Sequence, residues 1–236
     1  MFANIDIIDI GLWILYLSIP IFIFYIAYLI FTKAFRYMGF TSIEAVIIVL
    51  GSLVLGLSWT INIFELEISN VFANIYLFTY NNWNVGINMG GAIIPISLSI
   101  YLIIKKKIRW KNVLIGIAIV AFVTYLVTYP DPSKGIVAKL PLGFMPAIVA
   151  SIVSVFLLYK DFKKAAPFAY ISGTIGVLVG ADVFHLFELL NHQITSPTNA
   201  VIGGANVFDM VFITGIIAVV VDGIILFRQR MKEGIE

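Results

Sequence analysis

Residues 173–190 read GTIGVLVGADVFHLFELL, and residues 205–223 read ANVFDMVFITGIIAVVVDG. Each of these apolar runs carries a carboxylate, Asp182 in the first and Asp209 in the second, and charged side chains at membrane depth are rare and usually functional. Asp182 stands eight residues before the end of its run and Asp209 six residues after Gly203. At about 1.5 Å per helical residue, both lie roughly 9–12 Å below one membrane face. We therefore expect an antiparallel pair of helices to bring the two carboxyl groups together.

The composition indicates an integral membrane protein. Of the 236 residues, 61% are hydrophobic and 12% are charged, and the mean hydropathy is +1.04. A soluble domain would have about 25% charged residues. The spans use up almost the whole chain, so we expect one membrane domain over residues 1–236, placed in the cell membrane with the lipid bilayer as its partner. The chain contains no cysteine, which excludes disulfides and thiolate chemistry.

Seven apolar segments are long enough to span a bilayer, which predicts an all-α bundle of about seven transmembrane helices. The segments are Ile10–Phe31, Ser42–Phe64, Gly86–Ile104, Asn112–Thr128, Leu140–Tyr159, Pro167–Leu190 and Gly204–Phe227.

Basic residues follow every second segment, in the order Lys33 and Arg36, Lys105–Lys111, Lys160–Lys164, and Arg228–Lys232. Only Lys134 and Lys139 fall on the other side. The excess of Lys and Arg in cytoplasmic loops then predicts an outer N-terminus and a cytoplasmic C-terminus. We interpret the run of lysines after the third segment as a topology signal and a contact for lipid headgroups, and we expect no nucleic acid partner.

The third segment has a weakened beginning. Asn88, Gly90 and Gly91 precede Pro95, a combination that loosens helical hydrogen bonding and permits close helix approach. Such backbone must be buried in protein or line a cavity. Before it, the aromatic-rich stretch 65–85 is typical of an interfacial or re-entrant segment on the outer face, where it would cover the site. Pro146 is expected to interrupt the fifth segment in the same manner.

Three stretches carry a resemblance over nearly the whole chain: VGINMGGAIIPISLSIYLI at residues 85–103, GTIGVLVGADVFHL at 173–186, and IGGANVFDMVFITGIIAV at 202–219. They resemble, in this order, the signature blocks of a prokaryotic (archaeal or bacterial) membrane family catalogued as domain of unknown function 1614. The family pattern more often has an amide residue at the position of His185 and a small or apolar residue at that of Asp222. The resemblance implies the fold and no activity.

A weaker, local resemblance points to intramembrane aspartyl proteases of the presenilin-like type. Gly180-Ala181-Asp182 is similar to their Gly-x-Gly-Asp motif, Phe208-Asp209 to their Tyr-Asp pair, and Pro146-Ala147-Ile148 to their Pro-Ala-Leu motif. Ala181 replaces a glycine, Phe208 lacks a hydroxyl, the order of the motifs is reversed, and such proteases usually have nine spans. The resemblance implies a hydrolase in which Asp182 and Asp209 cleave a peptide bond of a transmembrane substrate.

The chemistry of an acid pair supports this interpretation. Two carboxyl groups in a low-dielectric site do not both ionise, so one can act as general base and the other as general acid. We expect a set of neighbouring residues to line the site: Gly180, Ala181, His185, Asn206, Phe208, Asn88, Gly90, Gly91 and Pro146.

Two other functional classes stay open. Paired acids beside a broken helix also describe a transporter or channel coupled to protons or to a small cation. In a non-catalytic membrane assembly or scaffold protein, the acids would instead accept hydrogen bonds from Asn88, Asn206 or Thr214. We expect no cofactor, because every lysine that retinal would need lies in a loop and paired histidines for haem are lacking.

The remaining ionisable residues have simpler interpretations. Asp182, His185, Glu188 and His192 are spaced so that they could ligate a metal, but a membrane histidine more often binds a neighbouring acid, and no metal site is expected. Asp222 stands thirteen residues after Asp209 and cannot share its site. We expect Asp222 to form a hydrogen bond or ion pair near the cytoplasmic face, with Arg36 as one candidate.

Overall fold

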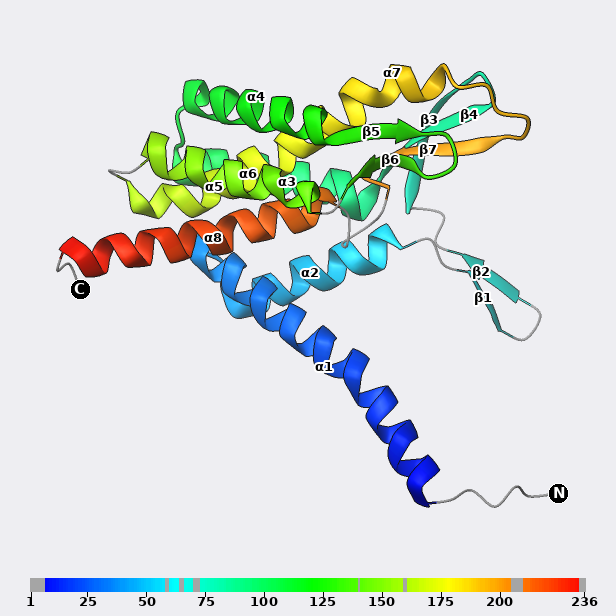
Figure 1. The fold of residues 1–236 in the computed structure, drawn as a ribbon, viewed down its shortest axis with the longest axis horizontal. Coiled ribbons are helices and arrows are strands. Elements are labelled where there is room, and N and C mark those ends of the chain that lie inside the picture. The colour runs from blue at the N-terminus through cyan, green and yellow to red at the C-terminus, as the bar shows by residue number, and fades with distance from the viewer. Residues whose placement is uncertain are drawn as a thin grey trace.

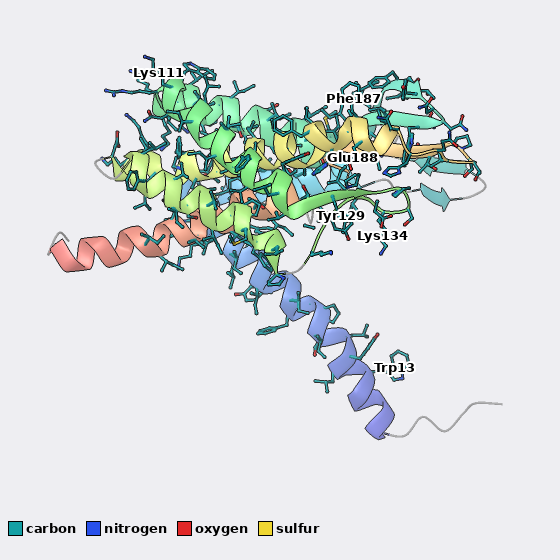
Figure 2. The ribbon with its side chains drawn as sticks, turned by 45° about the horizontal axis from the view of Figure 1, so that its top comes forward. Trp13, Lys111, Tyr129, Lys134, Phe187 and Glu188 are labelled. Atoms are coloured by element: carbon teal, nitrogen blue, oxygen red, sulfur yellow. The ribbon has the colours of Figure 1, made fainter. Side chains whose placement is uncertain are left out.

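The computed structural model describes residues 7–57, 60–63, 66–69, 73–139, 141–158, 161–204 and 210–233. Within these ranges the chain forms a bundle of apolar helices, and its short strands gather at one end (Figure 1). We call this the strand end. The opposite end is called the basic end. There, the connection at residues 107–109 and the first turns of the helices that begin at Trp110 and Phe162 carry basic residues: Lys107, Arg109, Lys111, Lys163 and Lys164. Figure 2 shows Lys111 at the basic end and Lys134 at the strand end.

Helix α6 (Phe162–Val177) lies at the centre of the bundle. It packs against α3 (Ile94–Lys106), α4 (Trp110–Val127), α5 (Met145–Leu158) and α8 (Met210–Glu233). Glycines make these packings close. A Cβ at Gly116 of α4 would lie 2.6 Å from the Phe168 ring of α6, and one at Gly176 would lie 2.6 Å from Val120 of α4. Small residues at helix interfaces are typical of membrane bundles, where backbones approach closely.

Helices α1 (Ile7–Met38) and α2 (Ser42–Gly56) join the bundle differently. The last turns of α1 are buried through Ala34, Phe35 and Met38. The rest of α1 extends away from the bundle, with Trp13 far from the other helices (Figure 2). Helix α2 begins with a capping box, in which Thr41 Oγ1 accepts the Glu44 N–H and the Glu44 carboxylate accepts the Thr41 N–H.

Two helices carry π-helical turns at corresponding places. Helix α6 continues without a break through η3 (Leu178–Val183) into α7 (Phe184–Leu190), and η1 (Met89–Ile93) leads directly into α3. A π turn contains extra backbone relative to an α turn and is often found at functional sites. Both π turns lie in the glycine-rich blocks that the sequence singles out, on the side of the bundle that faces the strands.

The strand end is built from three small sheets, which the expected all-α bundle does not contain. Strands β3 (Asn74–Tyr80) and β4 (Trp83–Asn88) form a hairpin. Asn81 and Asn82 have φ angles of 46° and 66°, the backbone of the two-residue turn that matches strand twist. Strand β7 (Thr198–Ile202) pairs with β4 in parallel, giving the order β3-β4-β7. The stretch 65–85 therefore contains a β-hairpin, and its expected place at the membrane interface stays a prediction.

Two further hairpins complete this end. Strands β1 (Thr60–Ile63) and β2 (Leu66–Ser69) form a hairpin. The predicted second span, Ser42–Phe64, overlaps β1, and its helix α2 already ends at Gly56, so the helix is shorter than predicted. Strands β5 (Thr128–Asp131) and β6 (Gly135–Ala138) follow α4. The chain then passes through the 3-10 turn η2 (Leu142–Phe144) into α5. Pro146 is the second residue of α5, where a helix tolerates proline, and so it does not interrupt the helix as expected.

The apolar helices agree with the predicted membrane character. By length and composition, four helical stretches of the described residues can cross a bilayer: Leu15–Met38, Met89–Lys106, Trp110–Val127 and Lys163–Leu190. Three shorter apolar helices, Ser42–Gly56, Leu142–Leu158 and Ile213–Ile225, correspond to the other predicted spans. The number of spans and the orientation stay predictions.

Candidate functional site

Asp182 is held by a main-chain hydrogen bond from a distant part of the chain. It lies in the π turn η3, half-buried, and its Oδ2 accepts the N–H of Gly203 at 2.8 Å. Gly203 has a φ of +68°, a backbone conformation that favours glycine. The Asp182 carboxyl is thus fixed against the turn that follows β7, immediately before the stretch that leads to α8.

A second glycine, Gly91, brings the glycine-rich block at residues 85–103 to the same place. A Cβ at Gly91 of η1 would collide with the carbonyl oxygen of Gly203. Asn88 fixes η1 from the other side: its Oδ1 accepts the Gly91 N–H at 2.7 Å, and its Nδ2 donates to the Gly56 carbonyl at 2.9 Å and to Asn74 Oδ1 at 2.8 Å. Asn88 is therefore a buried clamp that positions Gly91 next to the Asp182–Gly203 pair.

A cavity of about 340 Å³ opens beside Asp182 at the strand end. Strand β7 and the β5–β6 hairpin form facing walls, and α7 and Trp83 of β4 close it. Its lining residues are Trp83, Pro132, Ser133, Lys134, Gly135, Ile136, Asp182, Leu186, Leu189, Thr198, Asn199, Ala200, Val201, Ile202 and Gly204. Asp182 is the acidic side chain of this lining and Lys134 the basic one, so the cavity combines one charge of each sign with apolar and main-chain surface.

The hairpin wall is held by a polar turn. Asp131 Oδ1 accepts the Ser133 N–H at 2.8 Å, the Ser133 hydroxyl at 2.6 Å and the Lys134 N–H at 3.2 Å. These hydrogen bonds, the Ser133 hydroxyl first, hold the pKa of the exposed Asp131 carboxyl below its ordinary value. The turn that carries Lys134 is thereby ordered by an ionised aspartate.

The other wall is the edge of a sheet. Strand β7 is the terminal strand in the order β3-β4-β7, and all five of its residues line the cavity. An edge strand presents main-chain N–H and C=O groups that another extended chain can pair with. Asp182 therefore lies in a cavity that offers a strand edge.

The start of α8 lies at the level of η3. Met210 and Val211, its first two residues, belong to one apolar cluster with Leu178 and Ala181 of η3. Ala181 directly precedes Asp182, and Met210 directly follows Asp209. Asp209 lies outside the described residues, as do Asn206 and Phe208, so the expected separation of the two carboxyl groups stays a prediction.

The match to a family model decides the classification. The model described as "Protein of unknown function (DUF1614)" matches residues 46–221, more than half of the chain. The chain belongs to the DUF1614 family. This confirms the family resemblance expected from the three glycine-rich blocks. Neither the curated proteins nor the solved structures gave a match.

In this DUF1614 protein, several residues that were expected to line the site face other parts of the bundle. Gly180 lies against α4, where a Cβ would collide with the Ala121 carbonyl oxygen. Gly90 lies against α2, at Ser52 and Gly56. Ala181 and Pro146 are buried in helix packing and do not line the cavity. Their roles are those of close packing. Of the expected lining residues that the structure describes outside η3, Gly91 and Asn88 reach the neighbourhood of Asp182, through Gly203.

His185 is directed toward α4. Its ring stacks on Tyr125 with centroids 4.5 Å apart, Nε2 lies 3.3 Å from the Tyr125 carbonyl oxygen, and Nδ1 lies 3.3 Å from the exposed Glu188 carboxylate. His192 presents its carbonyl oxygen to Trp83 Nε1 at 3.1 Å. In the described part of the chain, His, Asp and Glu side chains form no group of three suited to a metal ion. His185 is therefore not a lining residue, contrary to expectation.

The cavity also contains residues of this DUF1614 protein that the sequence analysis missed: Trp83, Lys134 and strand β7. The signal for the hairpin was present in the turn-forming run DPSKG at residues 131–135. The pairing of β4 with β7 has no local signal, because residues 83–87 and 198–202 are far apart in the chain. Asp222 lies outside this cavity: its carboxyl is buried beside the Ser154 hydroxyl and forms no ion pair with a described residue, so the expected pairing with Arg36 is not seen.

Proposed function

We propose that this DUF1614 protein is an intramembrane aspartyl-protease-like hydrolase, in which Asp182 and Asp209 cleave a peptide bond of a membrane substrate. The observation that carries the proposal is the placement of Asp182 in a cavity walled by the edge strand β7. The common apolar cluster of Ala181 and Met210 supports the second half of the pair, because these residues are the chain neighbours of the two aspartates.

The edge strand favours a peptide over a small metabolite. An extended peptide that adds to a sheet edge gains main-chain hydrogen bonds, and its side chains enter pockets along the strand. Pairing along Thr198–Ile202 would place the next residue of the peptide near the Gly203 turn, where Asp182 is bound. The proposed substrate is thus a transmembrane segment whose end unwinds at the strand end.

The proposed chemistry needs no group beyond the two carboxyls and water. The ionised carboxyl removes a proton from a water molecule, and the hydroxide oxygen bonds to the scissile carbonyl carbon. The other carboxyl donates its proton to the leaving nitrogen as the C–N bond breaks, and the products are a carboxylic acid and an amine. We assign the role of general base to Asp182, because the Gly203 N–H orients one of its carboxyl oxygens beside the cavity.

The test is cleavage of fluorescence-quenched transmembrane peptides by the purified full-length protein, with product ends mapped by mass spectrometry. We expect Asp182→Asn and Asp209→Asn each to lower the cleavage rate by at least about 100-fold, the usual share of a general acid or base. Asp161→Asn is the matched control, since this acid pairs with Lys164 at the basic end and lies outside the cavity lining. Cleavage that persists in both variants would overturn the proposal.

A peptide carrying a hydroxyethylene group in place of the scissile bond tests the strand-addition step separately. This group imitates the tetrahedral intermediate and has no bond to cleave. We expect it to inhibit the wild-type protein and, when fitted with a photo-crosslinker, to label residues of β7. Labelling of the exposed strand β3, the opposite edge of the same sheet, would contradict the proposed docking edge.

A proton- or cation-coupled carrier is the second candidate, favoured by the two π turns. Helix breaks at membrane depth often form the ion site of a carrier. Gly203 links the two π turns, because its backbone lies against Gly91 of η1 and its N–H donates to Asp182 of η3. The two functions separate in proteoliposomes. A carrier would move protons or sodium in the wild type, lose this flux in Asp182→Asn, and leave every peptide uncut.

We also propose that the chain crosses the cell membrane seven times with the strand end outside. The distribution of Lys and Arg supports this orientation. Since the chain lacks cysteine, single substitutions report sidedness directly. In intact cells we expect an impermeant thiol reagent to label Ser133→Cys at the strand end and to spare Lys111→Cys at the basic end. The reverse pattern would invert the topology.

A further inference from the structure

Asp222 is the most deeply buried acid in the described part of the chain. It lies in α8, its relative exposure is 0%, and both carboxyl oxygens lack a hydrogen-bond partner. Met210, which marks the level of the Asp182 site, is twelve residues earlier, or about 18 Å along the helix. Asp222 is thus a separate feature that the proposed hydrolysis does not use.

The polar groups around Asp222 come from α5. The Ser154 hydroxyl lies beside the Asp222 carboxyl, but its proton is donated to the Ala165 carbonyl oxygen of α6 at 2.7 Å. One turn earlier, the Ser151 hydroxyl is bonded to the carbonyl oxygens of Ala218 at 2.7 Å and Ala147 at 3.0 Å. A hydroxyl has one proton to donate. Ser154 therefore faces Asp222 as an acceptor.

Among the described residues, no Lys, Arg or His side chain forms an ion pair with Asp222. Gly223 packs against the ring of Tyr37 on α1, and the ion pairs among described residues are Lys164–Asp161 and His185–Glu188. An unpaired carboxylate buried in a protein interior costs several kcal/mol. An ionised carboxylate is also only an acceptor, so it cannot bond to an acceptor hydroxyl. A neutral carboxylic acid removes both problems, because its O–H can donate to Ser154 Oγ.

We propose that Asp222 is a proton-binding site, in which a neutral carboxylic acid donates to Ser154 Oγ and Ser154 in turn donates to the Ala165 carbonyl oxygen. The ligand is a proton, bound between α5, α6 and α8 on the side of the bundle toward the basic end. Release of the proton leaves a carboxylate, which must be stabilised by water or by a cation. Proton release is therefore coupled to a separation of α5, α6 and α8. The inference is independent of peptide hydrolysis at Asp182.

The test is infrared spectroscopy of the full-length protein in lipid nanodiscs at pH 7. A carboxylic acid has a C=O stretch separate from the bands of a carboxylate. We expect the wild type to show an acid band that Asp222→Asn removes, while Asp182→Asn leaves this component in place. Ser154→Ala shifts the band to higher frequency, because the acid loses its acceptor. Ser151→Ala, the matched control one turn away, leaves the frequency unchanged.

Several outcomes would overturn the proposal. If Asp222→Asn removes carboxylate bands and spares the acid band, Asp222 is ionised. If Ser154→Ala leaves the band in place, the assigned acceptor is wrong. If replacing potassium chloride with sodium chloride abolishes the acid band, the site takes sodium in place of the proton. Should Asp222→Asn fail to fold, solid-state NMR of the wild type can measure the carboxyl ¹³C shift of Asp222. This shift distinguishes a neutral Asp222 from an ionised one.

Discussion

The carboxyl group of Asp182 and the main-chain N–H of Gly203 are joined by a hydrogen bond of 2.8 Å. The backbone of Gly203 lies in turn against that of Gly91, which precedes α3. Three stretches that are far apart in the sequence thus meet at one point of the strand end. The contact between Gly91 and Gly203 is made by main chain and depends on glycine at both positions. The contact between Gly203 and Asp182 depends on a hydrogen-bond acceptor at position 182.

Replacing Gly203 by alanine should be costly for two reasons. Its φ of +68° is unfavourable for alanine, and a Cβ would lie 2.7 Å from the Gly91 carbonyl carbon and 2.8 Å from Ala92 Cβ. We expect Gly203→Ala to lower the free energy of unfolding by about 2–4 kcal/mol, measured by thermal unfolding in detergent. Gly135→Ala is the matched control: its φ is +82°, but a Cβ there would meet nothing within 4 Å. Equal losses in the two variants would show that crowding at Gly91 is not the cause.

Substitutions of Asp182 should separate structure from chemistry. Asp182→Ala leaves the half-buried Gly203 N–H without this acceptor, which costs about 1–3 kcal/mol of stability. Asp182→Asn retains a carbonyl oxygen that can accept the same N–H, so we expect a smaller loss of stability together with the loss of function. Hydrogen exchange of the Gly203 amide measures the bond directly. Rapid exchange in Asp182→Asn, equal to that in Asp182→Ala, would contradict this assignment.

The apolar helices, including the stretch that carries Asp182, follow from hydrophobic run length alone. The strand end does not. Asn81-Asn82 between β-branched and aromatic residues is a recognisable hairpin signal within the stretch expected to be interfacial. The parallel pairing of β4 with β7 arises only in the folded chain, because the two strands are separated by more than a hundred residues.

The placement of His185 shows a second limit of sequence reasoning. A spacing of three residues puts Asp182 and His185 on neighbouring positions of a regular α-helix. The π turn η3 ends at Val183, between them, and its larger number of residues per turn rotates the following helix. His185 consequently faces Tyr125 of α4. The direction of a side chain therefore cannot be predicted from a rotation of 100° per residue where the backbone departs from the α-helix.

The β5–β6 turn should loosen in acid. Hydrogen bonds from Ser133 hold the pKa of Asp131 below its ordinary value of 3.8, so the ionised carboxyl stabilises the turn. This stabilisation is complete above the ordinary value and is lost as the pH falls through the lowered pKa. We expect the Lys134 amide to exchange faster once Asp131 is protonated. Ser133→Ala should raise the pH of this change, and a transition at the same pH in both proteins would contradict the assigned cause.

Trp83 should be the most important apolar residue of the cavity wall. It is 1% exposed, packs with Val85, Leu189, Leu190 and Ala200, and donates its Nε1–H to the His192 carbonyl oxygen at 3.1 Å. We expect Trp83→Ala to lower the free energy of unfolding by about 3–5 kcal/mol, because it removes a buried ring between the sheet and α7. Trp83→Phe retains most of the ring and loses the hydrogen bond, for a loss of about 1 kcal/mol from the bond itself.

The control for Trp83 is an aromatic residue on the outer side of the same helix packing. Phe187 of α7, labelled in Figure 2, is 78% exposed, so Phe187→Ala should change stability little. Hydrogen exchange of the β7 amides gives a local measurement. We expect Trp83→Ala to speed this exchange, because the Trp83 ring packs with residues of α7 and of β7 itself beside the Asp182 cavity. If the two alanine variants cost the same stability, the cavity wall does not depend on Trp83, and the edge of β7 is held by its pairing with β4 alone.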